Sequence, residues 1–163
     1  MSKVLQEGIE NAVKLMEKGV LNRYQPATVS TSTMKDSEAE EDAYLLKFER
    51  AMAAYVGTKY AIGLNSGASA IFLAMKCGGI EIGSKVLTNA FTFNAVPSAI
   101  VHAGCEPVLV ECTDTFTIDL NDLENKIVES GSKCLILSYM RGRIPDLDIV
   151  LEICEKHDVY MIE

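Results

Sequence analysis

The sequence predicts an α/β fold, a three-layer α/β/α arrangement with a mostly parallel sheet. From Lys59 onward, short apolar runs alternate with segments of helical period. The apolar runs carry hydrophobic residues at successive positions, which is typical of strands covered by helices on both faces. At 163 residues, of which 48% are hydrophobic and 23% charged, the chain is long enough for one domain with a sizeable core.

The first 58 residues predict two helices joined by a long loop. Apolar residues at helical spacing predict a helix from about Val4 to Met16, which ends at Gly19. A polar stretch with Pro26 follows and predicts a loop or lid. A second helix then carries apolar residues from Tyr44 to Tyr55, and the acids before it suit the positive end of the helix dipole. These acids are Glu38, Glu40, Glu41 and Asp42.

The rest of the chain predicts five strands with helices between them. The strands are expected at residues 59–64, 85–88, 107–111, 133–138 and 158–163. The helices are expected around residues 68–77, 93–102, 120–128 and 146–156. Because each helix connects two apolar strands, the strands should run parallel.

Charge and hydropathy exclude several functional classes. The net charge of −8 and the isoelectric point near 4.8 disfavour a nucleic-acid-binding role, which depends on Lys and Arg. The N-terminus has no apolar signal-peptide core, and no apolar run approaches the roughly 18 residues of a membrane span. We therefore expect a cytoplasmic protein.

The cysteines and histidines predict neither a disulfide framework nor a metal site. The five cysteines form no C-x-x-C pair, and Cys77, Cys134 and Cys154 lie within apolar runs, so buried free thiols are expected. His102 and His157 have no partner at metal-ligand spacing. Both are expected to lie at helix ends.

Residues Gly63 to Met75, GLNSGASAIFLAM, predict an anion site. A strand ends at Leu64, Asn65 and Ser66 can cap the next helix, and Gly67 allows a tight turn. The unpaired N–H groups and dipole of a helix N-terminus suit a phosphate. The alternative is a capped connection without a ligand, and the stretch matches neither the G-x-G-x-x-G motif nor the P-loop motif.

Residues Lys85 to Gly104, KVLTNAFTFNAVPSAIVHAG, place two aromatic rings just beyond a strand. Phe91 and Phe93 follow the carboxyl end of that strand, where ligands bind in parallel sheets. One ring could stack on a flat heteroaromatic ligand. The alternative is that one ring packs in the core and the other closes the loop.

These stretches, in their order and spacing, resemble the N-terminal half of the DegT/DnrJ/EryC1/StrS family. The resemblance covers nearly all of the chain from Met16 and includes MRGRIPDLDIVLEICEKHDVYMIE. It implies the type I fold of enzymes that use pyridoxal 5'-phosphate, working as a homodimer. It also implies aminotransferase activity, with glutamate or glutamine as donor and a keto sugar, often nucleotide-linked, as acceptor.

The resemblance implies four cofactor-binding residues. The family's Ser-Gly-Thr motif matches Ser66, Gly67 and Ala68, which would hold the phosphate, and Phe93 would stack on the pyridine ring. Ala68 replaces the family's Thr and removes a hydroxyl. Ser84 likewise replaces the Asp of the family's Gly-Asp-x-Val turn.

A second family motif matches a turn rather than a binding site. The Gly-x-x-x-Asp-Met-Asp pattern falls on Gly142, Asp146, Leu147 and Asp148, and is expected to set the conformation and cap a helix.

The resemblance also implies that this chain is an N-terminal fragment. The family's last matching strand ends in Glu-Asp, whose Asp pairs with the pyridinium nitrogen, and the Schiff-base lysine lies further on; the sequence stops at Glu163. Residues 1–36 would then form an N-terminal helix and lid-like loop, and residues 37–163 part of the cofactor-binding large domain. We expect unpaired sheet edges at residues 60–64 and 133–138, and hence self-association.

Three alternatives remain open from the sequence. The chain could be a non-catalytic half that pairs with a separate C-terminal chain. The complete protein could instead be a sugar dehydratase of the same family, since the deciding position lies beyond Glu163. A nucleotide-binding α/β domain without pyridoxal chemistry is the third, although Thr88 and Asn89 stand where its acidic ribose contact would be expected.

Overall fold

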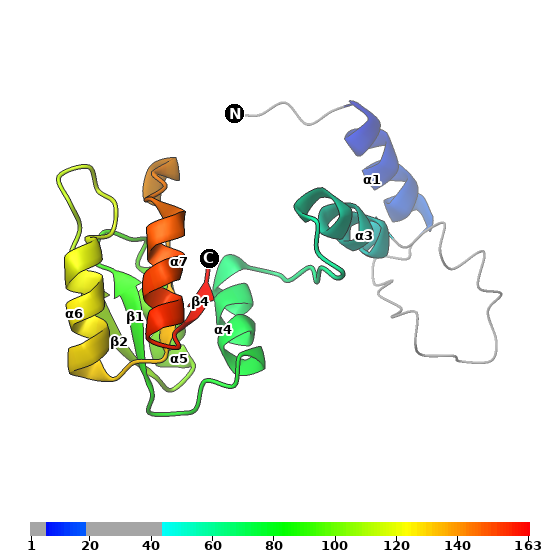
Figure 1. The fold of residues 1–163 in the computed structure, drawn as a ribbon. Helices are drawn as coiled ribbons and strands as arrows, with labels where there is room; N and C mark the ends of the chain where they lie inside the picture. Colours follow the sequence, from blue (N-terminus) through cyan, green and yellow to red (C-terminus); the bar gives the residue numbers. More distant parts are fainter. Residues whose placement is uncertain (1–5, 19–43) are drawn as a thin grey trace. The chain divides into compact units, whose positions relative to one another are not determined.

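The computed structural model describes residues 6–18 and 44–163, which form two compact units, residues 1–63 and 64–163 (Figure 1). The first unit contains helices α1 (Gln6–Lys18) and α3 (Tyr44–Val56), confirming both expected helices. The expected lid, with Pro26 and the acids before α3, lies outside the described residues.

The segment from Lys59 to Leu64 was expected to be a strand, and that prediction is wrong. It has no regular secondary structure, and the side chains of Tyr60 and Ile62 are both 73% exposed. A hydrogen bond anchors the segment to α3: Gly63 N donates to the buried carboxylate of Glu49 at 2.7 Å. Apolar alternation favours a strand only where a neighbouring strand supplies hydrogen bonds, and in the described part of the chain none pairs with it.

The second unit is built on a four-stranded parallel sheet. Its strands are β1 (Lys85–Asn89), β2 (Glu106–Val110), β3 (Cys134–Ile136) and β4 (Tyr160–Ile162), in the order β2-β1-β3-β4. The expected parallel sheet is confirmed. The expectation of an unpaired edge at residues 133–138 is wrong, because β3 pairs with β1 on one side and β4 on the other. Within the described residues, the two edge strands are β2 and β4.

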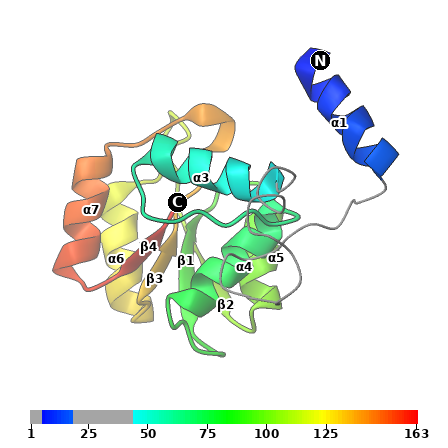
Figure 2. The same ribbon diagram turned by 90° about the vertical axis from the view of Figure 1, so that its right-hand side faces the viewer.

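Four helices cover the two faces of this sheet. Figure 2 shows α4 (Gly67–Cys77) and α5 (Ala95–His102) on one side of the strands, and α6 (Leu120–Ser130) and α7 (Leu147–Lys156) on the other. Each face has its own apolar core. Leu87, Leu123 and Val150 lie in the core under α6 and α7, and Met75 and Ile100 in the core under α4 and α5; all five are fully buried.

The two helices on one face of the sheet, α6 and α7, start at aspartate caps, of which the one at Asp146 was expected. Asp119 accepts hydrogen bonds from the first turn of α6, and Asp146 accepts one from Ile149 N in α7. Gly142 has a φ of 72°, a conformation that suits glycine. The turn and cap roles expected for Gly142 and Asp146 are therefore present.

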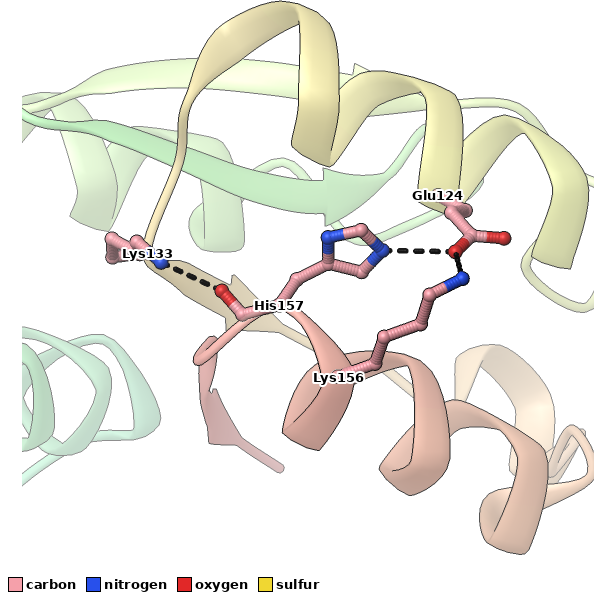
Figure 3. Close-up of polar contacts among 4 residues, drawn as sticks. All are labelled: Glu124, Lys133, Lys156 and His157. Atoms are coloured by element: carbon pink, nitrogen blue, oxygen red, sulfur yellow. Dashed lines mark hydrogen bonds and ion pairs between the residues drawn. The ribbon is translucent and has the colours of Figure 1, made fainter.

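A cluster of polar contacts joins α6 to α7 (Figure 3). One carboxylate oxygen of Glu124 lies 2.5 Å from Lys156 Nζ and 2.8 Å from His157 Nε2. Lys133 Nζ donates to the carbonyl oxygen of His157 at 2.6 Å. The hydrogen bonds from His157 and Lys156 lower the pKa of Glu124. His157 does lie at a helix end, but it is bonded there rather than simply solvated.

The cysteines are all free thiols, as expected, but not all are buried. Cys105, Cys134 and Cys154 are buried, whereas Cys77 was expected inside the core and is exposed at the end of α4. Burial raises the pKa of Cys134 to about 12, so this thiol is unreactive.

Among the described residues, no group of three His, Cys, Asp or Glu side chains could hold a metal ion. The described helices include none long and apolar enough to cross a membrane.

Candidate functional site

The order of the strands marks the end of the sheet at which a ligand would bind. The chain runs from β1 outward to β2, and then crosses back over β1 to β3. The connecting helices change faces at the same point, since α5 covers one face and α6 and α7 the other. In parallel α/β sheets, ligands bind at the carboxyl ends of the strands beside such a switch point. The β1 and β3 ends are therefore the expected centre of a site.

The N-terminus of α4 offers hydrogen-bond donors. Ser66 caps the helix, and its Oγ accepts from Ser69 N at 3.1 Å. The Ser66 carbonyl oxygen accepts from Ala70 N at 3.1 Å. Among the described residues, the N–H groups of Gly67 and Ala68 meet no acceptor, so both could donate to an anion.

Gly67 does not make the tight turn that the sequence predicted. It lies in the first turn of α4, without the positive φ seen at six other glycines. A Cβ added at Gly67 would meet no atom within 4 Å. Packing therefore does not require glycine here, and the missing side chain leaves the Gly67 and Ala68 N–H groups open to approach.

Phe93 follows β1 and lies just before α5. Phe93 is 62% exposed, so its side chain is accessible to a ligand. Phe91, in contrast, packs against Phe116 with ring centroids 4.9 Å apart. Phe91 thus packs against a half-exposed ring rather than in the core, and Phe93 is the ring of the two that is open to a ligand.

Asn89 holds the loop that carries Phe93. This last residue of β1 is 2% exposed, and its Nδ2 donates to Phe91 O at 2.8 Å and to Ser138 O at 3.2 Å. Its Oδ1 accepts from Ser138 N at 3.0 Å. Asn89 thus ties the aromatic loop to the end of β3 at the switch point.

The first turns of α4 and α5 line a shared hollow of about 390 Å³. Ala68 and Ser69 contribute one wall, Ala95 and Ser98 the opposite wall, and the hollow continues along both helices to Phe72 and His102. Ala68 and the residues that follow Phe93 therefore lie at the same end of the unit. Sequence analysis placed His102 at a helix end, but it did not predict the hollow or the roles of Ser69, Ser98 and Asn89.

The ends of β3 and β4 are also joined. The Tyr139 hydroxyl donates to the carboxylate of Glu163. Burial and this hydrogen bond raise the pKa of Tyr139 to about 12. Three strand ends, those of β1, β3 and β4, are thereby connected through side chains.

A family model for the DegT/DnrJ/EryC1/StrS aminotransferase family matches residues 26–163. The chain belongs to this family. It is 31% identical over 134 residues to the spore coat polysaccharide biosynthesis protein SpsC of Bacillus subtilis, covering 82% of this chain and 34% of SpsC. It is 33% identical over 121 residues to the GDP-perosamine synthase of Caulobacter vibrioides, covering 74% of this chain and 32% of the synthase.

Solved structures show the same fold. The pyridoxal phosphate form of Spr1654 from Streptococcus pneumoniae, a proposed sugar aminotransferase, superposes with a TM-score of 0.78 at 24% identity. That match covers 98% of this chain and 36% of Spr1654. The fold is therefore that of the type I pyridoxal-phosphate-dependent sugar aminotransferases. The chain spans about a third of the length of the relatives it matches.

The residues at the carboxyl edge fit the phosphate and ring of pyridoxal phosphate. The open N–H groups of Gly67 and Ala68 suit a phosphate, and the exposed side chain of Phe93 suits a flat ring. The hydroxyl oxygens of Thr88 and Thr92 are buried near the same strand end without a hydrogen-bond partner in the described chain. Buried hydroxyls normally have partners, so this edge has spare capacity to donate to an anion or water.

Proposed function

We propose that this chain supplies the phosphate and ring contacts of a pyridoxal-phosphate-dependent sugar aminotransferase. The observation that carries the proposal is the shared hollow, in which an open helix N-terminus faces the first turn after an exposed Phe93. Membership of the aminotransferase family supports the same assignment. Pyridoxal phosphate, when bound, supplies the electron-withdrawing ring that amino transfer requires.

Each proposed residue has a separate task. Ser66 fixes the start of α4, and Gly67 and Ala68 donate their backbone N–H groups to the phosphate. Because Ala68 has no hydroxyl, these contacts are made by the backbone. Phe93 stacks on the ring, and Asn89 holds the Phe93 loop against β3. These residues bind and orient; none of them moves the proton.

The proposal assigns amino transfer to a protein of the relatives' length. In that longer protein, glutamate or glutamine donates the amino group and a nucleotide-linked keto sugar accepts it. Two copies of the protein form a homodimer. The names of relatives such as GDP-perosamine synthase support a nucleotide-linked sugar. The resemblance to the family places the lysine that tethers the cofactor and carries the proton further along than the part that this chain matches. We therefore propose that the 163-residue chain by itself transfers no amino group.

Two alternative functions, a split aminotransferase and a sugar dehydratase, would use the same cofactor site. A split protein would regain activity when this chain is mixed with a separately produced C-terminal half. A sugar dehydratase would consume the same class of substrate without releasing an aminated sugar. Co-expression with a C-terminal half from a relative, followed by product analysis, separates the three.

The test of the proposed function is a cofactor titration of this chain, followed by an activity assay. Purified chain is titrated with pyridoxal phosphate by absorbance, reduced with borohydride, and mapped for labelled lysines. We expect weak saturable binding that Gly67→Val abolishes, scattered labelling of surface lysines, and no 2-oxoglutarate from glutamate and a nucleotide-linked keto sugar. Unchanged binding in Gly67→Val would move the phosphate site elsewhere. Labelling of one lysine with turnover would show that the chain is active alone.

A further inference from the structure

An exposed pair of arginines lies at the carboxyl edge of the sheet. Arg141 and Arg143, two of the chain's four arginines, flank Gly142 in the turn that follows β3. Neither forms an ion pair within residues 6–18 and 44–163, whereas Lys126, Lys133 and Lys156 all do. The chain has a net charge of −8, so two unpaired guanidinium groups at this edge create a local region of positive charge.

The turn that carries these arginines is anchored at its start. Ser138 is bonded to Asn89 of β1, and the Tyr139 hydroxyl is bonded to Glu163 beyond β4. Within the turn, Gly142 N donates to Tyr139 O at 2.9 Å and Arg143 N donates to Met140 O at 3.2 Å. The arginines are therefore presented from a fixed turn beside the candidate cofactor site, not from a free loop.

The backbone does not explain the arginine at position 141. Its φ of 57° and ψ of 27° lie in the left-handed region, which glycine or asparagine adopts at lower cost. Unusual backbone conformations in folded proteins concentrate at ligand sites. The guanidinium group itself is therefore the feature of Arg141 that calls for a role.

We propose that Arg141 and Arg143 bind the diphosphate group of the nucleotide-linked sugar. This inference rests on the proposed function, because it places the substrate at the same edge as the cofactor. Guanidinium groups make paired hydrogen bonds to phosphate oxygens, and a diphosphate offers two adjacent phosphoryl groups to two arginines. The carboxylates of the amino donor share this anionic chemistry, so the test must distinguish the two.

Calorimetric titration of the full chain with inorganic pyrophosphate, GDP and glutarate tests the proposal. Pyrophosphate and GDP should bind, and added salt should weaken both. The double variant Arg141→Gln/Arg143→Gln should lose at least about tenfold in affinity for each. A matched charge change at two exposed lysines of the same unit, Lys76→Gln in the last turn of α4 and Lys85→Gln at the first residue of β1, should change affinity less than about twofold.

A glycine substitution separates ligand binding from folding. Arg141→Gly removes the guanidinium but suits the left-handed backbone, so its melting temperature should be equal or higher while pyrophosphate affinity falls. No pyrophosphate binding by the natural chain would overturn the proposal. So would equal losses in the arginine and lysine variants. Glutarate binding as tight as pyrophosphate would overturn the diphosphate assignment in favour of a carboxylate.

The Gly67→Val variant distinguishes this inference from the cofactor proposal. If pyrophosphate bound at the N-terminus of α4, Gly67→Val would weaken it and the arginine variants would not, which would overturn the inference. Pyridoxal phosphate titration should be unaffected by Arg141→Gln/Arg143→Gln. If the chain bound pyrophosphate through the arginines but failed to bind pyridoxal phosphate, the cofactor proposal would fail and the diphosphate turn would remain.

Discussion

Replacing Asn89 with leucine should destabilise the second unit more than most single substitutions. Leucine has a similar size but removes three hydrogen bonds, and it leaves Phe91 O, Ser138 O and Ser138 N without their partner. At about 1 kcal/mol for each lost hydrogen bond, the expected loss is about 3 kcal/mol of unfolding free energy. Burial of the leucine side chain offsets part of this, so we expect about 2–3 kcal/mol.

Urea unfolding followed by circular dichroism measures this loss. For a unit of this size, a loss of 2–3 kcal/mol lowers the midpoint by about 1–2 M urea. Asn121→Leu is the matched control, because Asn121 is exposed at the start of α6 and the change should stay within about 0.5 kcal/mol. Equal midpoints for the two variants would show that Asn89 does not clamp the aromatic loop. Asn89→Leu should also weaken pyridoxal phosphate binding, because the Phe93 loop loses its anchor.

The remaining predictions concern the ring contact, the α6–α7 cluster and the state of association. Phe93→Ala should weaken pyridoxal phosphate binding by about 0.5–1.5 kcal/mol with little change in melting temperature, whereas Tyr55→Ala, also at an exposed ring, should leave binding unchanged in the same absorbance titration. Because the pKa of Glu124 is lowered from 4.5, its ionised form stabilises the fold above that value, and this contribution disappears as pH falls through the lower folded pKa. Melting temperatures from pH 7 to 3 should therefore fall more steeply for the natural chain than for Glu124→Gln; parallel curves would contradict this. Finally, the open β4 edge should make the isolated chain self-associate in sedimentation experiments, and a monodisperse monomer would refute that expectation.

Local sequence patterns predicted the helices that their own residues cap and the strands that helices cover on both faces. The strand β1 is buried from Val86 to Asn89 because helices cover both of its faces, and Asp146 caps the start of α7 with its own side chain. The segment from Lys59 to Leu64 has the same composition but lacks a pairing strand in the described chain. Strand composition alone therefore could not distinguish a paired segment from an unpaired one.

The candidate site was predictable only in part. The cap at Ser66 and the aromatic at Phe93 lie within short motifs, so their placement could be inferred from neighbouring residues. The Asn89 contacts join residues 49 positions apart and depend on the crossover that places β3 beside β1. The tight turn predicted at Gly67 was wrong. A glycine at a helix start can either make a tight turn or leave the backbone N–H groups accessible to a ligand, and the sequence does not distinguish the two.

The pairing of β4 makes one backbone amide a reporter of assembly. Tyr160 N donates to Lys133 O, and Ile162 O accepts from Leu137 N, so both groups face β3. Because successive N–H groups of a strand point in opposite directions, the N–H of Met161 faces away from β3. In the isolated chain this amide should exchange with deuterium quickly, while the amide of Tyr160 is protected. Slow exchange at Met161 would report that a further strand has joined the sheet, before any enzymatic activity is measured.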